Sequence, residues 1–80
     1  MEETRQVVLD LLFHFIELGK EIQKARKTSP LTFEHKQQLR RIRLVLNTID
    51  VYALDPAIKG PYEELLAIYR EVVPEPSTLG

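Results

Sequence analysis

The amino-acid sequence predicts an all-α fold, in which a long antiparallel helical hairpin and a shorter third helix form a three-helix bundle. Apolar residues recur at helical spacing in three segments, and prolines fall at the breaks between them. The second segment repeats its apolar residues every three and four positions, as long helices do when they pack at a shallow angle. We expect one domain at residues 1–73, with helices over about 3–28, 31–54 and 61–73, and a flexible tail at 74–80.

The first helix is unusually apolar. Its stretch Val7–Leu18 has nine apolar residues among twelve. The exceptions, Asp10, His14 and Glu17, form one narrow stripe at about 100° per residue and leave about two thirds of the circumference apolar. Gly19 faces away from this stripe, where it either marks a close approach of another backbone or is simply tolerated.

The second helix follows a short turn. A proline ends the first helix, because it has no N–H to donate and disfavours the helical conformation at the residue before it. Either Ser29 or Thr32 then caps the second helix. One face of this helix forms a packing seam that comprises His35, Leu39, Ile42, Leu46, Ile49 and Ala53. Phe33, Leu44 and Val51 lie on the opposite side, where they need contact with either the third helix or another chain.

The break before the third helix is marked by Asp55–Pro56 and Gly60–Pro61. It has room for a single helical turn capped by Asp55, after which Pro61 opens the third helix. Because this helix is shorter than either arm of the hairpin, it should fold back over the half that contains Val7–Leu18.

The apolar excess of the first helix predicts a homodimer, with two bundles joined into a larger one. Each helix of a three-helix bundle uses about 120–150° of its circumference to contact its neighbours, whereas the first helix is apolar over about 240°. Two alternatives remain: a monomer in which the loop at 54–60 covers the excess, and an obligate complex with a different protein. The predicted partner interface comprises Leu9, Leu12, Phe13, Phe15, Ile16, Leu44 and Val51.

Basic residues gather around the predicted turn of the hairpin. Helical spacing places six of them in two rows at this tip: Lys20, Lys24, Lys27, Lys36, Arg40 and Arg43. Such a surface attracts phosphate backbones or an acidic protein. Nucleic acid is the less favoured of these ligands, because the sequence has no DNA-reading motif and offers only Phe33 for base stacking.

Enzymatic chemistry has little support in the sequence. The chain has no cysteine, and its two serines, Ser29 and Ser77, fall in a predicted turn and in the predicted tail. The polar stripe of the first helix, extended by Glu21, has a spacing that metal sites use, but solvent contact alone explains it and no second helix carries a matching set. We predict no catalytic, cofactor-binding or metal-binding residue.

Length and charge narrow the function classes. The chain has 80 residues and a formal net charge of −1. Its N-terminal stretch, MEETRQ, is acidic where a signal peptide is basic, and no apolar run reaches the roughly 20 residues of a membrane span. We therefore expect a small soluble cytoplasmic protein that acts as a non-enzymatic protein–protein interaction or adaptor module and forms a homodimer. The alternative is a small nucleic-acid-associated regulatory protein that binds through the basic hairpin tip.

Overall fold

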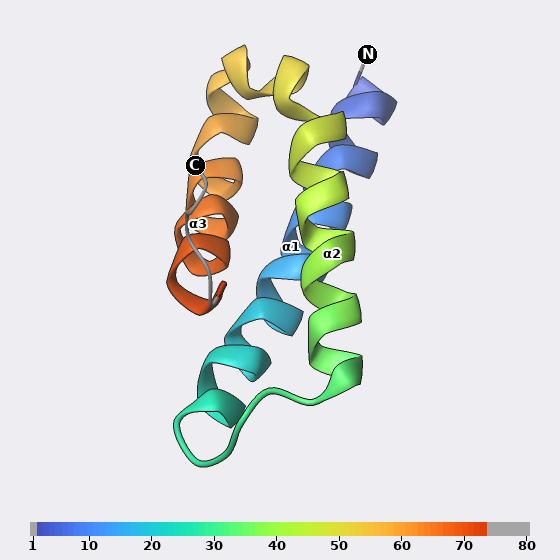
Figure 1. Cartoon of the computed structure of the whole chain (residues 1–80). Helices are drawn as coiled ribbons and strands as arrows, with labels where there is room; N and C mark the ends of the chain where they lie inside the picture. Colours follow the sequence, from blue (N-terminus) through green and yellow to red (C-terminus); the bar gives the residue numbers. More distant parts are fainter. Residues whose placement is uncertain (1, 74–80) are drawn as a thin grey trace, which may run out of the picture.

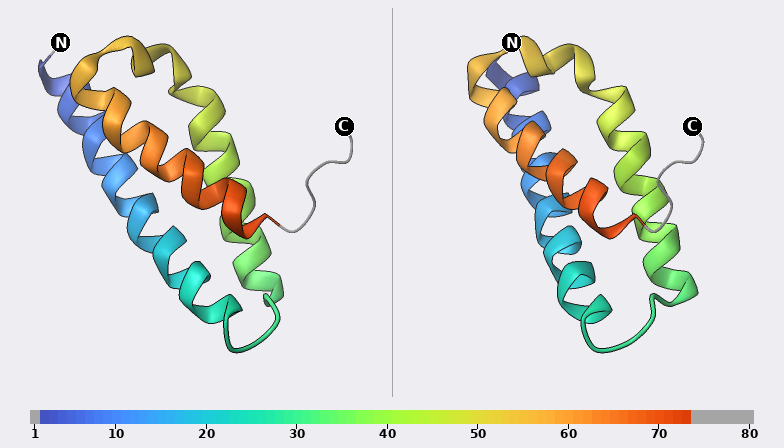
Figure 2. Two further views of the ribbon diagram at one scale, coloured as in Figure 1. Left: turned by 90° about the vertical axis from the view of Figure 1, so that its left-hand side faces the viewer. Right: turned by 60° about the vertical axis from the view of Figure 1, so that its left-hand side comes forward.

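The computed structural model describes residues 2–73, which form three α-helices and one short 3-10 helix (Figure 1). These elements are α1 (Glu2–Arg26), α2 (Phe33–Thr48), the 3-10 helix η1 (Asp50–Leu54) and α3 (Pro56–Val72). Helices α1 and α3 run in the same direction, and α2 runs antiparallel to both (Figures 1 and 2). The all-α prediction is confirmed for the described part of the chain. The tail predicted at residues 74–80 lies outside it.

The turn between α1 and α2 is closed by hydrogen bonds at both of its ends. The backbone N–H groups of Thr28 and Ser29 both donate to the carbonyl of Ala25, which ends α1. Thr32 caps α2: its hydroxyl accepts from the backbone N–H of His35 at 3.1 Å, and its own N–H donates to the His35 imidazole at 3.2 Å. This reciprocal arrangement is a capping box. Of the two predicted caps, the structure uses Thr32.

Helix α2 ends at Thr48, earlier than the predicted end near residue 54, and η1 continues the chain. Three of the four residues from Thr48 to Val51 are β-branched, and such residues lower helix propensity. The following turns are tighter, with the N–H of Tyr52 donating to the Ile49 carbonyl and the N–H of Asp55 donating to the Tyr52 carbonyl.

Helix α3 begins at Pro56, five residues before the predicted start at Pro61. Asp55 caps it, as predicted for a single turn, by accepting from the N–H of Ala57 at 3.0 Å. The helix continues through Pro61 because the preceding residue, Gly60, has no Cβ to clash with the proline ring. Ile58, which is fully buried, anchors this first turn to the core.

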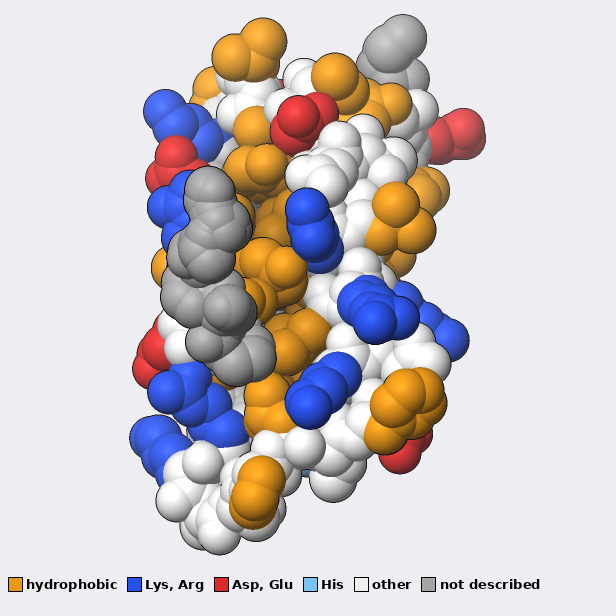
Figure 3. All heavy atoms as spheres, in the orientation of Figure 1, with side chains coloured by type: hydrophobic (Ala, Val, Ile, Leu, Met, Phe, Trp, Pro, Cys, Tyr) orange, Lys and Arg blue, Asp and Glu red, His pale blue; other side chains and the backbone are white. Residues whose placement is uncertain are grey.

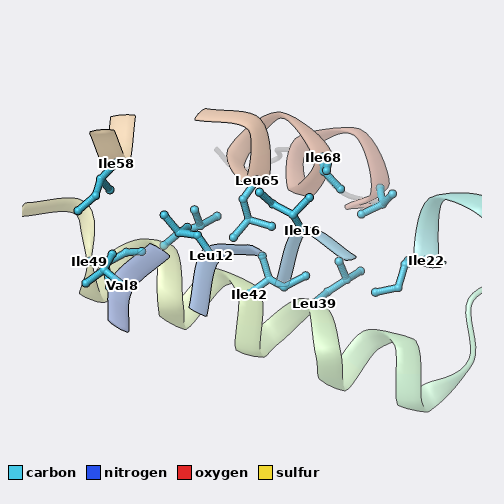
Figure 4. Close-up of a cluster of buried hydrophobic side chains, with 12 residues drawn as sticks. Val8, Leu12, Ile16, Ile22, Leu39, Ile42, Ile49, Ile58, Leu65 and Ile68 are labelled. Carbon is cyan, nitrogen blue, oxygen red and sulfur yellow. The ribbon is translucent and has the colours of Figure 1, made fainter. Parts of the chain in front are cut away.

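One apolar core joins the three helices (Figure 4). Its residues are Val8, Leu12, Ile16, Ile22, Leu39, Ile42, Leu46, Ile49, Ile58, Leu65, Ile68 and Val72. The four Leu and Ile residues of the predicted seam belong to it, whereas Ala53 is only partly buried. The Tyr62 hydroxyl donates to the Leu46 carbonyl at 3.3 Å and joins α3 to α2.

Helices α1 and α3 pack closely at Gly19. A Cβ placed on Gly19 would lie 2.7 Å from Cγ2 of Ile68, so only glycine allows the two helices to approach this closely. Polar contacts continue along the same side of α1. Lys20 lies 3.8 Å from the Glu64 carboxylate, and Gln23 donates to the Glu71 carboxylate. Of the two sequence interpretations of Gly19, close approach is therefore correct.

The substitution Gly19→Ala should lower the free energy of unfolding by about 1 kcal/mol. Overpacking against Ile68 costs about 1–3 kcal/mol, and the higher helix propensity of alanine offsets about 1 kcal/mol of this. In an Ile68→Ala background the same substitution should instead stabilise, because the clashing methyl group is gone. Chemical denaturation followed by circular dichroism measures both effects. Stabilisation by Gly19→Ala in the wild-type background would contradict the close approach.

Asp55 should make stability depend on pH. The backbone N–H of Ala57, and the Arg5 guanidinium at 2.8 Å, hold the pKa of Asp55 below its ordinary value, against a smaller opposing effect of desolvation. Because folding lowers this pKa, the stabilisation is present above the unfolded-state pKa and is lost as the pH falls through the folded-state value. An asparagine at this position would still cap the helix, so the melting temperature of the Asp55→Asn variant should fall less than that of the wild type between about pH 7 and about pH 3. Equal decreases would show that Asp55 contributes nothing to this pH dependence.

Candidate interaction surface

The residues of α1 predicted to form a partner interface lie mostly inside the bundle. Leu12 is 0% exposed and Ile16 is also buried, so both belong to the core of a single chain. Leu9 and Phe15 are half-buried and pack against that core. Phe13 alone is mainly exposed. The reason is the position of α3, which packs against the side of α1 that contains Gly19 and brings these neighbouring residues under cover.

The predicted interface residues of α2 remain at the surface. Leu44 is 66% exposed and Val51 is 68% exposed, and Phe33 in the same row is 75% exposed. At about 100° per residue this row lies on the side of the helix opposite Leu39 and Ile42 of the core. Helix α3 packs on the core side and does not reach the row. The sequence left two possible contacts for these residues, the third helix or another chain. The third helix is excluded.

A second exposed apolar row runs along α1 and was not among the predicted interface residues. Val7 is 64% exposed, Leu11 is partly exposed and Leu18 is half-buried. Gly19 and Gln23 mark the side of α1 that contacts α3. At about 100° per residue, this exposed row lies about 100° or more around the helix from that side. The helical spacing identified this flank as apolar, but nothing in the sequence shows that α3 covers the other flank instead.

Together these two rows define what we call the α1/α2 face, which comprises Val7, Leu11 and Leu18 of α1, Phe33 and Leu44 of α2, and Val51 of η1. Figure 2 shows the hairpin of α1 and α2 on one side of α3. Helical spacing places each row on its helix away from the residues that pack against α3. Figure 3 shows hydrophobic side chains along the outer edge of α2, away from α3. Large apolar side chains that stay exposed in rows, on one side of a small domain, mark a surface for contact with another molecule.

The outer surfaces of α1 and α2 carry opposite charges. The outward side of α1 is acidic, with Asp10, Glu17 and Glu21 all exposed. Helix α2 is basic: it contains Lys36, Arg40, Arg41 and Arg43, and Glu34 is its only acidic residue. Residues 2–73 contain no group of three or more His, Cys, Asp or Glu side chains placed to hold a metal ion. His14, within the polar stripe of α1, has its ring edge-on to Phe15 at 5.1 Å.

The six residues of the predicted basic tip form two groups. Lys36, Arg40 and Arg43 lie exposed on α2. The α1 group comprises Lys20 and Lys24 on α1 and Lys27 just after its end, and Lys20 is close to Glu64 of α3. In the view of Figure 3, basic side chains stand along α2 and near the C-terminal end of α1, with hydrophobic side chains between them. The α2 group is therefore a separate basic surface.

No family model, curated protein sequence or solved structure matches this chain. None of the helices within residues 2–73 is long and apolar enough to span a membrane. The pattern of apolar and charged residues on the surface is therefore the guide to function.

Proposed function

We propose that the protein is a non-enzymatic protein–protein interaction module that works as a homodimer, with the α1/α2 face as its binding surface. The observation that carries this proposal is the exposed row on α2 and η1, where Phe33, Leu44 and Val51 are each about two thirds or more exposed. Three apolar residues in line on an outer helix face contribute nothing to the core of their own chain. They are available to a partner.

The energetics support a second copy as that partner. Full burial of a Val, Leu or Phe side chain stabilises by about 1.5–3 kcal/mol, and association costs about 4–15 kcal/mol. A two-fold dimer uses each residue of the α1/α2 face twice, so its six residues supply twelve side chains to one interface. A domain of this size also hides only about 60% of the surface of its unfolded chain, and dimerisation adds to this limited burial.

Substitutions on the α1/α2 face should dissociate the dimer without unfolding the chain. The solution mass from light scattering on a sizing column should be twice the 9.3 kDa of one chain for the wild type. Leu44→Asp and Leu11→Asp should each give the mass of one chain with helicity preserved, because they place a charge on an exposed position of the interface.

Two controls show whether this effect is specific. Phe13→Asp adds the same charge on the other flank of α1 and should leave the dimer intact, whereas Leu12→Asp buries a carboxylate in the core and should unfold the chain. A wild-type protein that has the mass of one chain at every concentration contradicts the proposal. A dimer that survives both face substitutions shows that another surface is used.

The basic surface of α2 favours a second candidate function, the binding of nucleic acid. Lys36, Arg40 and Arg43 are exposed, and among the described residues no ion pair involves them. Each phosphate contact releases a bound counterion, so binding through such a surface weakens steeply as salt concentration rises.

The double substitution Arg40→Glu with Arg43→Glu should abolish binding of a short fluorescent RNA or DNA duplex, measured by anisotropy at low salt. The wild-type affinity should fall with salt by a logarithmic slope of about −0.7 to −0.9 per phosphate contact. Lys24→Glu with Lys27→Glu reverses two charges in the α1 group and should leave most of the affinity. No binding by the wild type at low salt, or equal binding by the α2 variant, contradicts this second function.

A further inference from the structure

We infer that the dimer is crossed: helix α1 of each protomer lies over α2 of the other, with the two-fold axis parallel to the helices. This inference rests on the homodimer proposed above and specifies its geometry. It follows from the charges of the two helices and from the heights of their exposed residues along the helix axes.

A two-fold dimer through the α1/α2 face has two simple arrangements. An axis that lies in the face and parallel to the helices places each α1 over the partner's α2. An axis that lies in the face but perpendicular to the helices stacks each helix on its own copy, so that α1 contacts α1 and α2 contacts α2. In both arrangements α3 stays on the outside, because it lies on the opposite side of each protomer (Figure 2).

The charges distinguish between these arrangements. Stacking α2 on itself would set one basic helix against another, and stacking α1 on itself would set its acidic stripe against another acidic stripe. Like charges brought together at an interface destabilise it, whereas opposite charges favour association. The crossed arrangement sets the acidic α1 against the basic α2 on both sides of the axis.

The levels of the residues along the helices agree with the crossed arrangement. Val8 and Ile49 lie at one end of the core, and Leu39 and Ile22 lie toward the other, where the turn joins the helices (Figure 4). Rotation about an axis parallel to the helices does not change the height of a residue along them. A residue of α1 and a residue of α2 at the same height in one chain therefore also lie at the same height across the interface. At a rise of about 1.5 Å per residue, Val7 is then level with Val51, and His14 is level with Leu44.

This register gives each exposed group a matching partner in the second copy. Val7 faces the partner's Val51. The partner's Leu44 lies between the levels of Leu11 and Leu18, and its aliphatic side chain covers this part of the row.

The charged groups at the edge of the face match in the same register. The partner's Arg40 lies between the levels of Glu17 and Glu21, so its guanidinium has a carboxylate on either side. Within one chain, by contrast, no ion pair among the described residues involves Arg40 or Glu21. Their charges are therefore free to act between protomers.

The first test reverses the charges of one pair. Glu21→Arg and Arg40→Glu should each weaken the dimer by about tenfold or more in sedimentation analysis at low salt, because each single substitution places like charges together twice in the dimer. The double variant, with both substitutions in one chain, should recover most of the wild-type affinity. In the stacked arrangement Glu21 and Arg40 do not face each other, so the double variant has no reason to recover affinity that either single substitution loses.

The second test measures proximity directly and uses the fact that the chain has no cysteine. A mixture of Val7→Cys chains with Val51→Cys chains should form a covalent dimer under mild oxidation, because these positions face each other in the crossed dimer. Val7→Cys chains alone should not. Cross-linking of Val7→Cys chains alone, or charge variants with unchanged affinity, overturns the crossed geometry while the homodimer stands. A wild-type protein with the mass of one chain overturns both.

Discussion

The close contact of α1 with α3 at Gly19 determines the rest of this structure. Helix α1 is apolar over most of its circumference, so its own pattern does not decide which flank becomes core. The absence of a side chain at Gly19 decides it, because only there can Ile68 of α3 approach the α1 backbone directly. Once α3 is docked on that side, Leu12 and Ile16 become buried, and Val7 and Leu11 remain outside.

The position of α3 also separates the surface of the hairpin into two sides with different roles. The inner side supplies the aliphatic seam of α2 to the core, and α3 closes it through Leu65 and Ile68. The outer side keeps the row of Phe33, Leu44 and Val51, which no element of the described chain covers. A two-helix hairpin thus has two apolar surfaces, and α3 is long enough and placed to cover one of them. The other is the surface on which a second chain can complete a larger bundle.

Much of this fold could be predicted from the sequence, and the failures have physical causes. The α2 seam was predictable because its Leu and Ile residues recur every three and four positions, as core-facing residues of packed helices do, and these residues are all buried. The start of α3 was not, since a Gly–Pro pair normally ends a helix. Here Gly60 has no Cβ to clash with the ring of Pro61, and the buried Ile58 anchors the preceding turn to the core. The interface on α1 could not be assigned because both of its flanks are apolar. The choice between them depends on a contact with Ile68, almost fifty residues later in the chain.

The charge distribution connects this architecture to association. A net charge of −1 conceals an acidic outer side of α1 beside a basic α2. These charges point away from the core, and the described part of the chain joins α1 to α2 by no ion pair, so they give little to the stability of one protomer. At an interface between two copies the same charges discriminate between arrangements, because they favour the pairing of unlike helices and oppose the pairing of like ones. In the dimer that we propose, apolar residues supply the affinity and the acidic stripe of α1 with the basic α2 determines the geometry.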